Sequence, residues 1–114
     1  MSEYLDEDGY PTEEAIEQIE NWSYNDPKGW FKFIENIWHL RSWSWTEGYF
    51  KDHEYDPAEK YRYYMSTAGW SGNEDIIRAM QENNILWSDT WVQTRRGGHY
   101  IFEVKDEQTN SRTR

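Results

Sequence analysis

The stretch YRYYMSTAGWSGNEDII, residues 61–77, decides the fold of this chain. Its first part is rich in strand-forming residues, and Tyr61, Tyr63 and Met65 alternate onto one face, which predicts a β-strand near residues 61–67. This strand runs directly into a segment that carries helix-starting signals. A strand and a helix joined by a short connection therefore form the centre of the predicted domain.

The second part of the stretch predicts a helix near residues 72–83. Ser71 is followed three residues later by Glu74, which matches a capping box: the Ser71 hydroxyl accepts from the Glu74 amide, and Glu74 accepts from the Ser71 amide. Asparagine tolerates the left-handed conformation that commonly ends helices, so the helix is expected to end at Asn83 and Asn84. Its buried stripe consists of Ile76, Ile77 and Met80.

A β-hairpin follows this helix. Residues 87–94 and 99–104 are strand-like, and they flank the segment Arg95-Arg96-Gly97-Gly98. The two glycines allow the positive φ angles that a tight hairpin turn needs. Alternation along the second strand separates two faces, one with Tyr100, Phe102 and Val104, the other with His99, Ile101 and Glu103.

Two helices are predicted before the central strand, near residues 12–22 and 27–39. Pro11 and Thr12 start the first of them, and Asp26 followed by proline places an N-cap before a proline at the first helical position of the second. Each helix has one apolar face, formed by Ala15, Ile16, Ile19 and Trp22 in the first and by Trp30, Phe31, Ile34, Ile37 and Trp38 in the second.

The segment between the second helix and the central strand has a weaker pattern. Trp43 and Trp45 alternate as in a short strand. A polar loop is then expected from its turn-forming and charged residues, which are Gly48, Asp52, His53, Asp56 and Pro57.

These elements predict an α+β fold, with a small antiparallel sheet packed against about three helices. The folded unit is expected to be a single domain over residues 10–104. Residues 1–9 are acidic, and residues 105–114 contain no apolar side chain. We therefore expect a flexible lead-in at the first segment and a flexible tail at the second.

Composition limits the class of protein. The 114 residues include eight Trp, nine Tyr and four Phe but no cysteine, so disulfides and thiolate metal sites are excluded and a few large aromatic side chains must build the core. The sequence has no apolar run of membrane-spanning length and no secretory signal pattern, which favours an intracellular protein without a membrane segment.

The net charge of −10 is concentrated at one end of the chain. Residues 1–26 hold nine acidic residues and no Lys or Arg, so the remainder is close to neutral. A negative surface of this kind repels nucleic acid and favours a protein partner with a basic surface. The alternative is a solubilising arm followed by the solvated side of a helix.

One ligand site is predicted where the third helix begins. Free amides at the helix start, over Trp70, Ser71, Gly72 and Asn73, attract anions if cations lie nearby. The hairpin turn offers Arg95, Arg96 and His99, and Trp91 or Trp70 can stack on a base. The alternatives are an ordinary capping box, solvated arginines and a histidine at a strand edge. More generally, the tryptophans outside the first two helices can line a cleft or anchor an interface; they are Trp43, Trp45, Trp70, Trp87 and Trp91.

No catalytic residue, metal site or cofactor is predicted. Ser71 with His99 lacks a nucleophile elbow. Paired carboxylates, Glu74 with Glu103 or Asp89, give only a weak signal. The three histidines do not have the spacing of a helical zinc site, and residues 52–56 lack the glycine and glutamate positions of a calcium loop.

Three segments resemble a group of small bacteriophage and prophage proteins whose function is not established. They are GYPTEEA at residues 9–15, GWSGNEDII at residues 69–77 and RRGGHY at residues 95–100, and the likeness covers roughly residues 9–104. The resemblance implies a phage origin and a location in the host cytoplasm. It carries over no functional residues, because the group has no assigned activity.

Three functions are consistent with the sequence, in this order. The first is a non-enzymatic phage accessory protein that binds a host protein, for example as an inhibitor of a host defence system. The second is a small pocket protein that sequesters an anionic, nucleotide-like ligand. The third is a small hydrolase or transferase.

Overall fold

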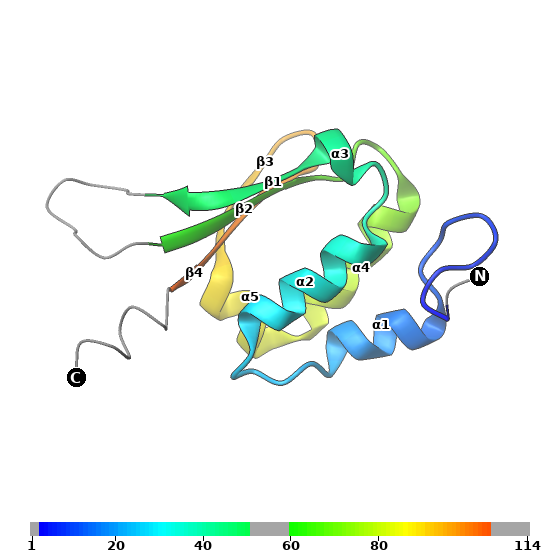
Figure 1. Ribbon diagram of the computed structural model, residues 1–114, viewed down its shortest axis with the longest axis horizontal. Helices are drawn as coiled ribbons and strands as arrows, with labels where there is room; N and C mark the ends of the chain where they lie inside the picture. The colour runs from blue at the N-terminus through cyan, green and yellow to red at the C-terminus, as the bar shows by residue number, and fades with distance from the viewer. Residues whose placement is uncertain (1–2, 51–59, 106–114) are drawn as a thin grey trace, which may run out of the picture.

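A four-stranded antiparallel sheet forms one layer of the protein (Figure 1). The computed structural model describes residues 3–50 and 60–105. The strand order is β1-β2-β4-β3, with β1 at Trp45–Phe50, β2 at Lys60–Ser66, β3 at Trp91–Arg95 and β4 at His99–Lys105. The predicted α+β class with a small antiparallel sheet is therefore confirmed.

The helices form the second layer, and Figure 1 shows α1, α2, α4 and α5 together on one side of the sheet. Within the described residues the helices are α1 at Glu13–Glu20, α2 at Pro27–Ile37, α3 at Arg41–Ser44, α4 at Ser71–Glu82 and α5 at Asn84–Thr90. The helix α1 packs on α4. None of these described helices has the length and the apolar composition that a membrane span requires.

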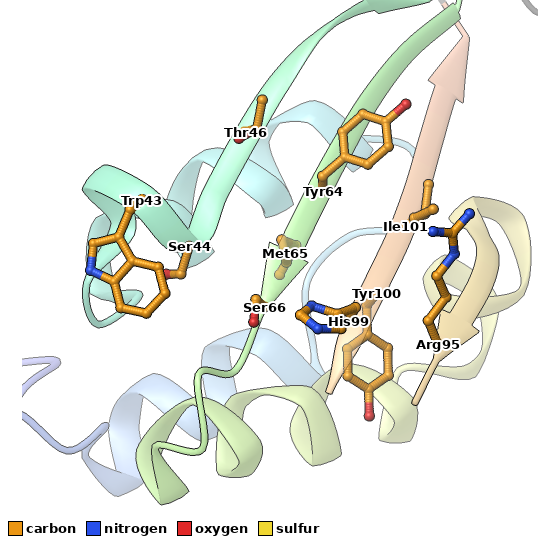
Figure 2. Close-up of a pocket in the computed structure, with 10 residues that line it drawn as sticks. All are labelled: Trp43, Ser44, Thr46, Tyr64, Met65, Ser66, Arg95, His99, Tyr100 and Ile101. Atoms are coloured by element: carbon orange, nitrogen blue, oxygen red, sulfur yellow. The ribbon is translucent and has the colours of Figure 1, made fainter. Parts of the chain in front are cut away.

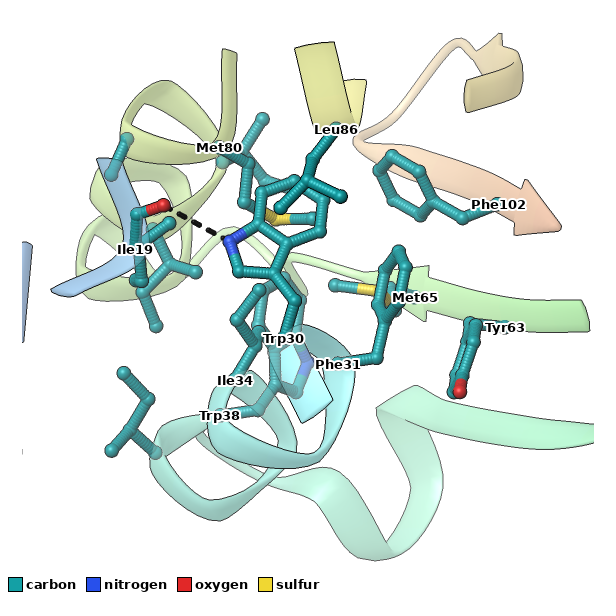
Figure 3. Close-up of a cluster of buried hydrophobic side chains, with 14 of the residues drawn as sticks. Ile19, Trp30, Phe31, Ile34, Trp38, Tyr63, Met65, Met80, Leu86 and Phe102 are labelled. Atoms are coloured by element: carbon teal, nitrogen blue, oxygen red, sulfur yellow. Dashed lines mark hydrogen bonds between the residues drawn. The ribbon is translucent and has the colours of Figure 1, made fainter. Parts of the chain in front are cut away.

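The core lies between the two layers and combines a cluster of aromatic rings with aliphatic side chains (Figure 3). Phe31 of α2 stacks on Tyr63 of β2 with ring centroids 4.1 Å apart, and Phe102 of β4 lies 5.3 Å from Phe31. The buried Trp30 donates its indole N–H to the carbonyl of Ile19 at 3.0 Å, which satisfies the polar end of a fully buried ring. The apolar faces predicted for the first two helices thus form the core.

The starts of the first two helices follow the predicted chemistry. The Thr12 hydroxyl accepts from the Ala15 amide at the start of α1. Asp26 caps α2 by accepting from the Gly29 amide at 3.1 Å, with Pro27 at the first helical position. Before α1, residues 3–12 form a turn in which the amide of Thr12 donates to the carbonyl of Tyr4.

The start of α4 differs from the prediction, because Ser71 is not its cap. The N-cap is Trp70, and it makes no side-chain capping bond. Ala68 and Gly69 adopt left-handed φ angles of 55° and 72°, and this turn begins the helix one residue earlier than predicted. Ser71 is therefore the first helical residue, and its hydroxyl lies 3.0 Å from the hydroxyl of Tyr10.

The segment after α4 also differs from the prediction. Residues 84–90 form a helix, α5, so the first predicted hairpin strand is shortened to β3. Asn83 has φ −87° rather than a left-handed angle, and its side chain accepts from the Leu86 amide. The same side chain donates to the carbonyls of Ile19 and Trp22. Asn83 thus ends one helix, starts the next and ties both to the end of α1, a long-range role that local sequence does not reveal.

The segment from residue 41 onward contains a helix and a strand in place of the predicted short strand and loop. Trp43 belongs to α3, and β1 begins at Trp45 and includes Gly48. The rest of the predicted polar loop, Asp52, His53, Asp56 and Pro57, lies outside the described residues. The predicted tail also lies outside them except for Lys105, the last residue of β4.

Candidate functional site on the open face of the sheet

The face of the sheet opposite the helices carries two cross-strand rows of side chains. Directly opposed residues in an antiparallel pair point to the same face. One row joins Thr46, Tyr64, Ile101 and Gln93, and the next joins Ser66, His99 and Arg95. We call this surface the open face.

A concavity of about 470 Å³ lies over these rows. Figure 2 shows Trp43 on one side of it and Arg95 on the other, with Tyr64, Ser66 and His99 between them. This volume falls within the range of small-molecule sites. Its lining consists of Trp43, Ser44, Thr46, Tyr64, Met65, Ser66, Arg95, His99, Tyr100 and Ile101.

Trp43 lies beside the concavity because hydrogen bonds made by the buried Ser44 fix the position of α3. Leu40 begins α3 in the left-handed region at φ 62°. The buried Ser44 hydroxyl lies 2.7 Å from the carbonyl of Leu40 and accepts from the Trp38 indole at 3.1 Å. With Ser44 and Trp38 directed inward, Trp43 is turned outward, where 64% of its surface is exposed. A large aromatic side chain is thus held in solvent by a fixed support.

The concavity differs in charge from the rest of the chain. None of its lining residues is acidic, although the chain carries 22 acidic residues and a net charge of −10. Arg62, also on the open face, is paired with Glu103 at 2.9 Å. Arg95 has no carboxylate partner within residues 3–50 and 60–105. The concavity therefore offers one uncompensated cation to a ligand.

The structure brings together two of the predicted site residues and separates the others from them. Arg95 and His99 oppose each other on the open face. Arg96 is exposed in the hairpin turn and does not line the concavity. Trp91 lies on β3 outside the concavity, where its indole donates to the Thr94 hydroxyl at 2.8 Å.

The predicted helix-start site is filled by its own side chains. The Trp70 ring stacks on His39 with centroids 4.3 Å apart and lies 4.7 Å from the Tyr10 ring. A Cβ on Gly72 would lie 2.6 Å from the Trp70 indole nitrogen. Asn73 is fully buried and bonded to the backbone of His39. The side chains of Trp70 and Asn73 are thus occupied by contacts within the protein. A second concavity of about 220 Å³ lies beside the first turn of α4, where Thr67, Glu74 and Gly98 line it, but none of the predicted site residues does.

The strand end and the hairpin turn do meet, as the predicted pocket required, and the Thr67 side chain packs against Gly98, where an added Cβ would overlap the Thr67 hydroxyl. The Thr67 amide donates to the Gly98 carbonyl at 3.0 Å. Arg95 points onto the open face, whereas Asn73 is buried in the helical layer, so the predicted cation and the predicted helix-start residues do not line one cavity.

Sequence reasoning missed most of the lining. The sequence indicates Trp43 as a tryptophan able to line a cleft and places Ile101 on the strand face of His99, but it does not mark Thr46, Tyr64 or Ser66 as site residues. A signal was present in the alternation of residues 61–67, since Tyr64 and Ser66 fall on the face opposite Tyr63. That alternation does not reveal which face remains uncovered.

The fold and the site together define a small α+β protein with one sheet face covered by helices and an aromatic, cationic concavity on the other. Comparisons of the chain with protein-family models, with curated protein sequences and with solved structures find no match. Among the described residues, no three His, Asp or Glu side chains gather into a group that could hold a metal ion.

Proposed function

We propose that this chain is a phage-encoded, non-enzymatic protein that binds a host protein through the open face of its sheet. The observation that carries the proposal is the presence of Trp43, Tyr64 and Arg95 around one concavity. Tryptophan, tyrosine and arginine are the residue types that contribute most to binding energy at protein interfaces. Trp43 and Tyr64 are 64% and 37% exposed, so binding would remove a large apolar area from water.

Charge indicates what the partner presents to this surface. Arg95 has no acidic neighbour in the concavity, so a carboxylate on the partner would find an available bidentate donor. The exposed acids of α1, Glu13, Glu14 and Glu17, belong to the helical layer. For the acidic surface of α1 we expect a host protein with a basic surface. Such binding could inhibit a host defence system.

The side-chain chemistry of the concavity favours binding over catalysis. Ser66 and His99 are opposed across β2 and β4, but the Ser66 hydroxyl accepts from the Ala68 amide at 3.3 Å. No acidic residue lines the concavity to orient His99 as a base. A hydrolase or transferase is therefore the third candidate.

The host-protein proposal is tested by affinity capture from host lysate with two matched pairs of variants. Trp43→Ala and Arg95→Ala change the concavity, whereas Trp91→Ala and Arg96→Ala remove exposed residues of the same types outside it. We expect a specific protein to be retained by the wild type and both controls, and to be lost or reduced at least tenfold with Trp43→Ala. Capture that is equal for all five proteins would refute an interface on the open face.

A small anionic ligand with a planar ring is the second candidate for the same concavity. Three observations favour it: the volume of about 470 Å³, the exposed Trp43 ring, and Arg95, which has no carboxylate partner among the described residues. Aromatic rings stack on bases, and arginine binds phosphate. Thermal denaturation with a panel of nucleotides tests it. A nucleotide that stabilises the wild type and Arg96→Ala, but not Arg95→Ala, would support this candidate; no stabilisation by any nucleotide would exclude it for that panel.

A further inference from the structure

The two edge strands of the sheet differ in how they are protected against pairing with another strand. Edge strands that are short, bulged or charged resist such pairing. The edge strand β3 has a register shift between Trp91 and Gln93 and ends at Arg95, which Arg96 follows. The other edge, β1, pairs with β2 without interruption from Trp45 to Phe50. It contains no proline, lysine or arginine.

The one charged residue of β1 does not protect its edge. Glu47 accepts from the Trp45 indole and from the Tyr61 hydroxyl, both at 2.7 Å. These bonds hold the carboxylate on the face of its own sheet. The backbone groups of β1 that point away from β2 thus have no described strand beside them, because β1 is the first strand in the sheet order.

The sequence of β1 is complementary to a second copy of itself. We consider two antiparallel copies related by a two-fold axis perpendicular to the sheet. Directly opposed residues point to the same face of the sheet, so even-numbered residues must pair with even-numbered residues and odd with odd. Centring the axis on Gly48 places Glu47 opposite Tyr49 of the other copy, a carboxylate facing a phenol. Centring it on Glu47 would place two carboxylates opposite each other. Charge thus favours the register centred on Gly48 over the one centred on Glu47.

We propose that two copies of this chain associate through their β1 edges, antiparallel and with the two-fold axis at Gly48, to form one continuous sheet. Tyr49, which is 61% exposed and contacts Tyr61 edge to face at 4.9 Å, becomes covered by the second copy. The two Gly48 residues lie directly opposite each other at the axis. The open faces of both copies then point to the same side.

The net charge of −10 opposes self-association, but its distribution reduces this effect. Four of the acids lie in α1, which Figure 1 shows on the side of the molecule away from β1, with α2 between them. Charges further apart than about 8 Å are largely screened at physiological salt. Association is therefore expected to strengthen as salt is raised from low to physiological concentration.

Gly48 provides a direct test because the chain contains no cysteine. A Cβ at Gly48 meets no atom within 4 Å and Gly48 is not in the left-handed region, so Gly48→Cys fits the fold. Two thiols at the axis lie within disulfide distance in the proposed register. We expect oxidised glutathione to convert Gly48→Cys almost completely to a covalent dimer, and Val92→Cys on the other edge to give only a slow background.

Charge at the same position supplies an independent test by analytical ultracentrifugation over a dilution series. The wild type and Val92→Lys are expected to be dimeric, whereas Gly48→Lys and Gly48→Asp are each expected to be monomeric through like-charge repulsion. Mixing the two Gly48 variants should restore a heterodimer. Far-ultraviolet circular dichroism confirms that each variant is folded.

Specific outcomes would overturn the proposal. They are a wild type that is monomeric throughout the series, equal crosslinking of Gly48→Cys and Val92→Cys, or a Gly48→Lys and Gly48→Asp mixture that stays monomeric. The assembly does not depend on the proposed host-protein function, and loss of capture by Trp43→Ala leaves it unaffected. The dimer would present two concavities on the same side, so that a partner with two binding sites could bind both of them. This consequence alone rests on the proposed binding of a host protein.

Discussion

The Asn73 side chain holds both backbone groups of His39. Its amide oxygen accepts from the His39 N–H at 2.9 Å, and its NH₂ group donates to the His39 carbonyl at 3.1 Å and to the Thr67 carbonyl at 3.4 Å. Asn73 is fully buried. One side chain of α4 thus holds two segments in place, the connection between α2 and α3 and the end of β2. Since α3 carries Trp43, Asn73 also helps to position Trp43.

Replacement of Asn73 by alanine is expected to lower the free energy of unfolding by about 2–4 kcal/mol, because partly buried backbone groups lose their partners. Asn73→Asp keeps the acceptor but loses both donations and buries a charge, so it should be at least as harmful. Urea denaturation measures both. Asn84→Ala, at an exposed position, serves as the control and should change stability by less than about 1 kcal/mol. Equal stability of Asn73→Ala and Asn84→Ala would contradict this role.

Gly72→Ala is expected to destabilise the protein although alanine is the better helix former. The substitution gains about 0.5–1 kcal/mol in helix propensity, but its Cβ would lie 2.6 Å from the Trp70 indole nitrogen. Displacing the ring from His39 costs about 1–3 kcal/mol as overpacking. Thermal denaturation monitored by tryptophan fluorescence measures the change. Gly48→Ala, where the added Cβ meets no atom, should leave stability unchanged or raise it, and an increase for Gly72→Ala would show that the ring yields freely.

Phe31→Ala is expected to be the most harmful of the substitutions considered. Phe31 is fully buried and contacts Trp30, Tyr63 and Phe102, and removal of a buried phenylalanine costs about 3–5 kcal/mol. Phe31→Leu retains most of the volume and should cost less than half of that. Denaturant titration separates the two variants. Tyr24→Ala removes a 58% exposed ring and is the matched surface control; a cost similar to that of Phe31→Ala would mean that Phe31 is not central to the core.

Alkaline pH is expected to destabilise the protein through Tyr61. Desolvation, the hydrogen bond to Glu47 and the charge of Glu47 raise the pKa of Tyr61 from 10.0 to about 12. Because the folded state binds this proton more tightly, the stabilisation is complete below pH 10 and is lost as the pH rises from 10 to about 12. Denaturation over this range should show a smaller pH dependence for Tyr61→Phe than for the wild type.

Absorbance at alkaline pH provides the direct readout for the same group, since tyrosinate absorbs at longer wavelength than tyrosine. Glu47→Gln should lower the pKa of Tyr61 only in part, because desolvation is the largest cause of its elevation. The difference between the titration curves of the wild type and Tyr61→Phe reports Tyr61 itself, and a midpoint of this difference near pH 10 would contradict the elevated pKa.

The local pattern predicted the elements whose signals lie within one turn or one strand. Asp26 and Pro27 start α2, and the alternation of Tyr61, Tyr63 and Met65 marks β2, as expected. The failures involve contacts between distant parts of the chain. Ser71 meets Tyr10, so its predicted capping role is replaced by a tertiary contact. Asn83 ends α4 as predicted, but with φ −87° rather than a left-handed angle and with its side chain bonded to the end of α1.

Only part of the candidate site could be predicted from the sequence, because its residues come from elements that are far apart in the chain. Arg95 and His99 were recognised from the hairpin turn, but their partners Tyr64 and Trp43 come from β2 and α3. The sequence gives the two faces of each strand and not the layer that covers them. Of the helix-start residues, chosen for their free amides, Trp70 packs on the His39 ring and Asn73 bonds the His39 backbone, so both side chains are occupied by contacts within the protein.

The sequence by itself determined the α+β class, the aromatic core and the hairpin turn, because periodicity, helix caps and glycine conformation act over a few residues. The tertiary structure alone decided which sheet face is left open, which tryptophan is exposed and which edge strand is unprotected. These properties depend on how the helices pack against the sheet. That packing follows from the summed burial of side chains far apart in the chain, Phe31 on Tyr63 and Phe102 above all.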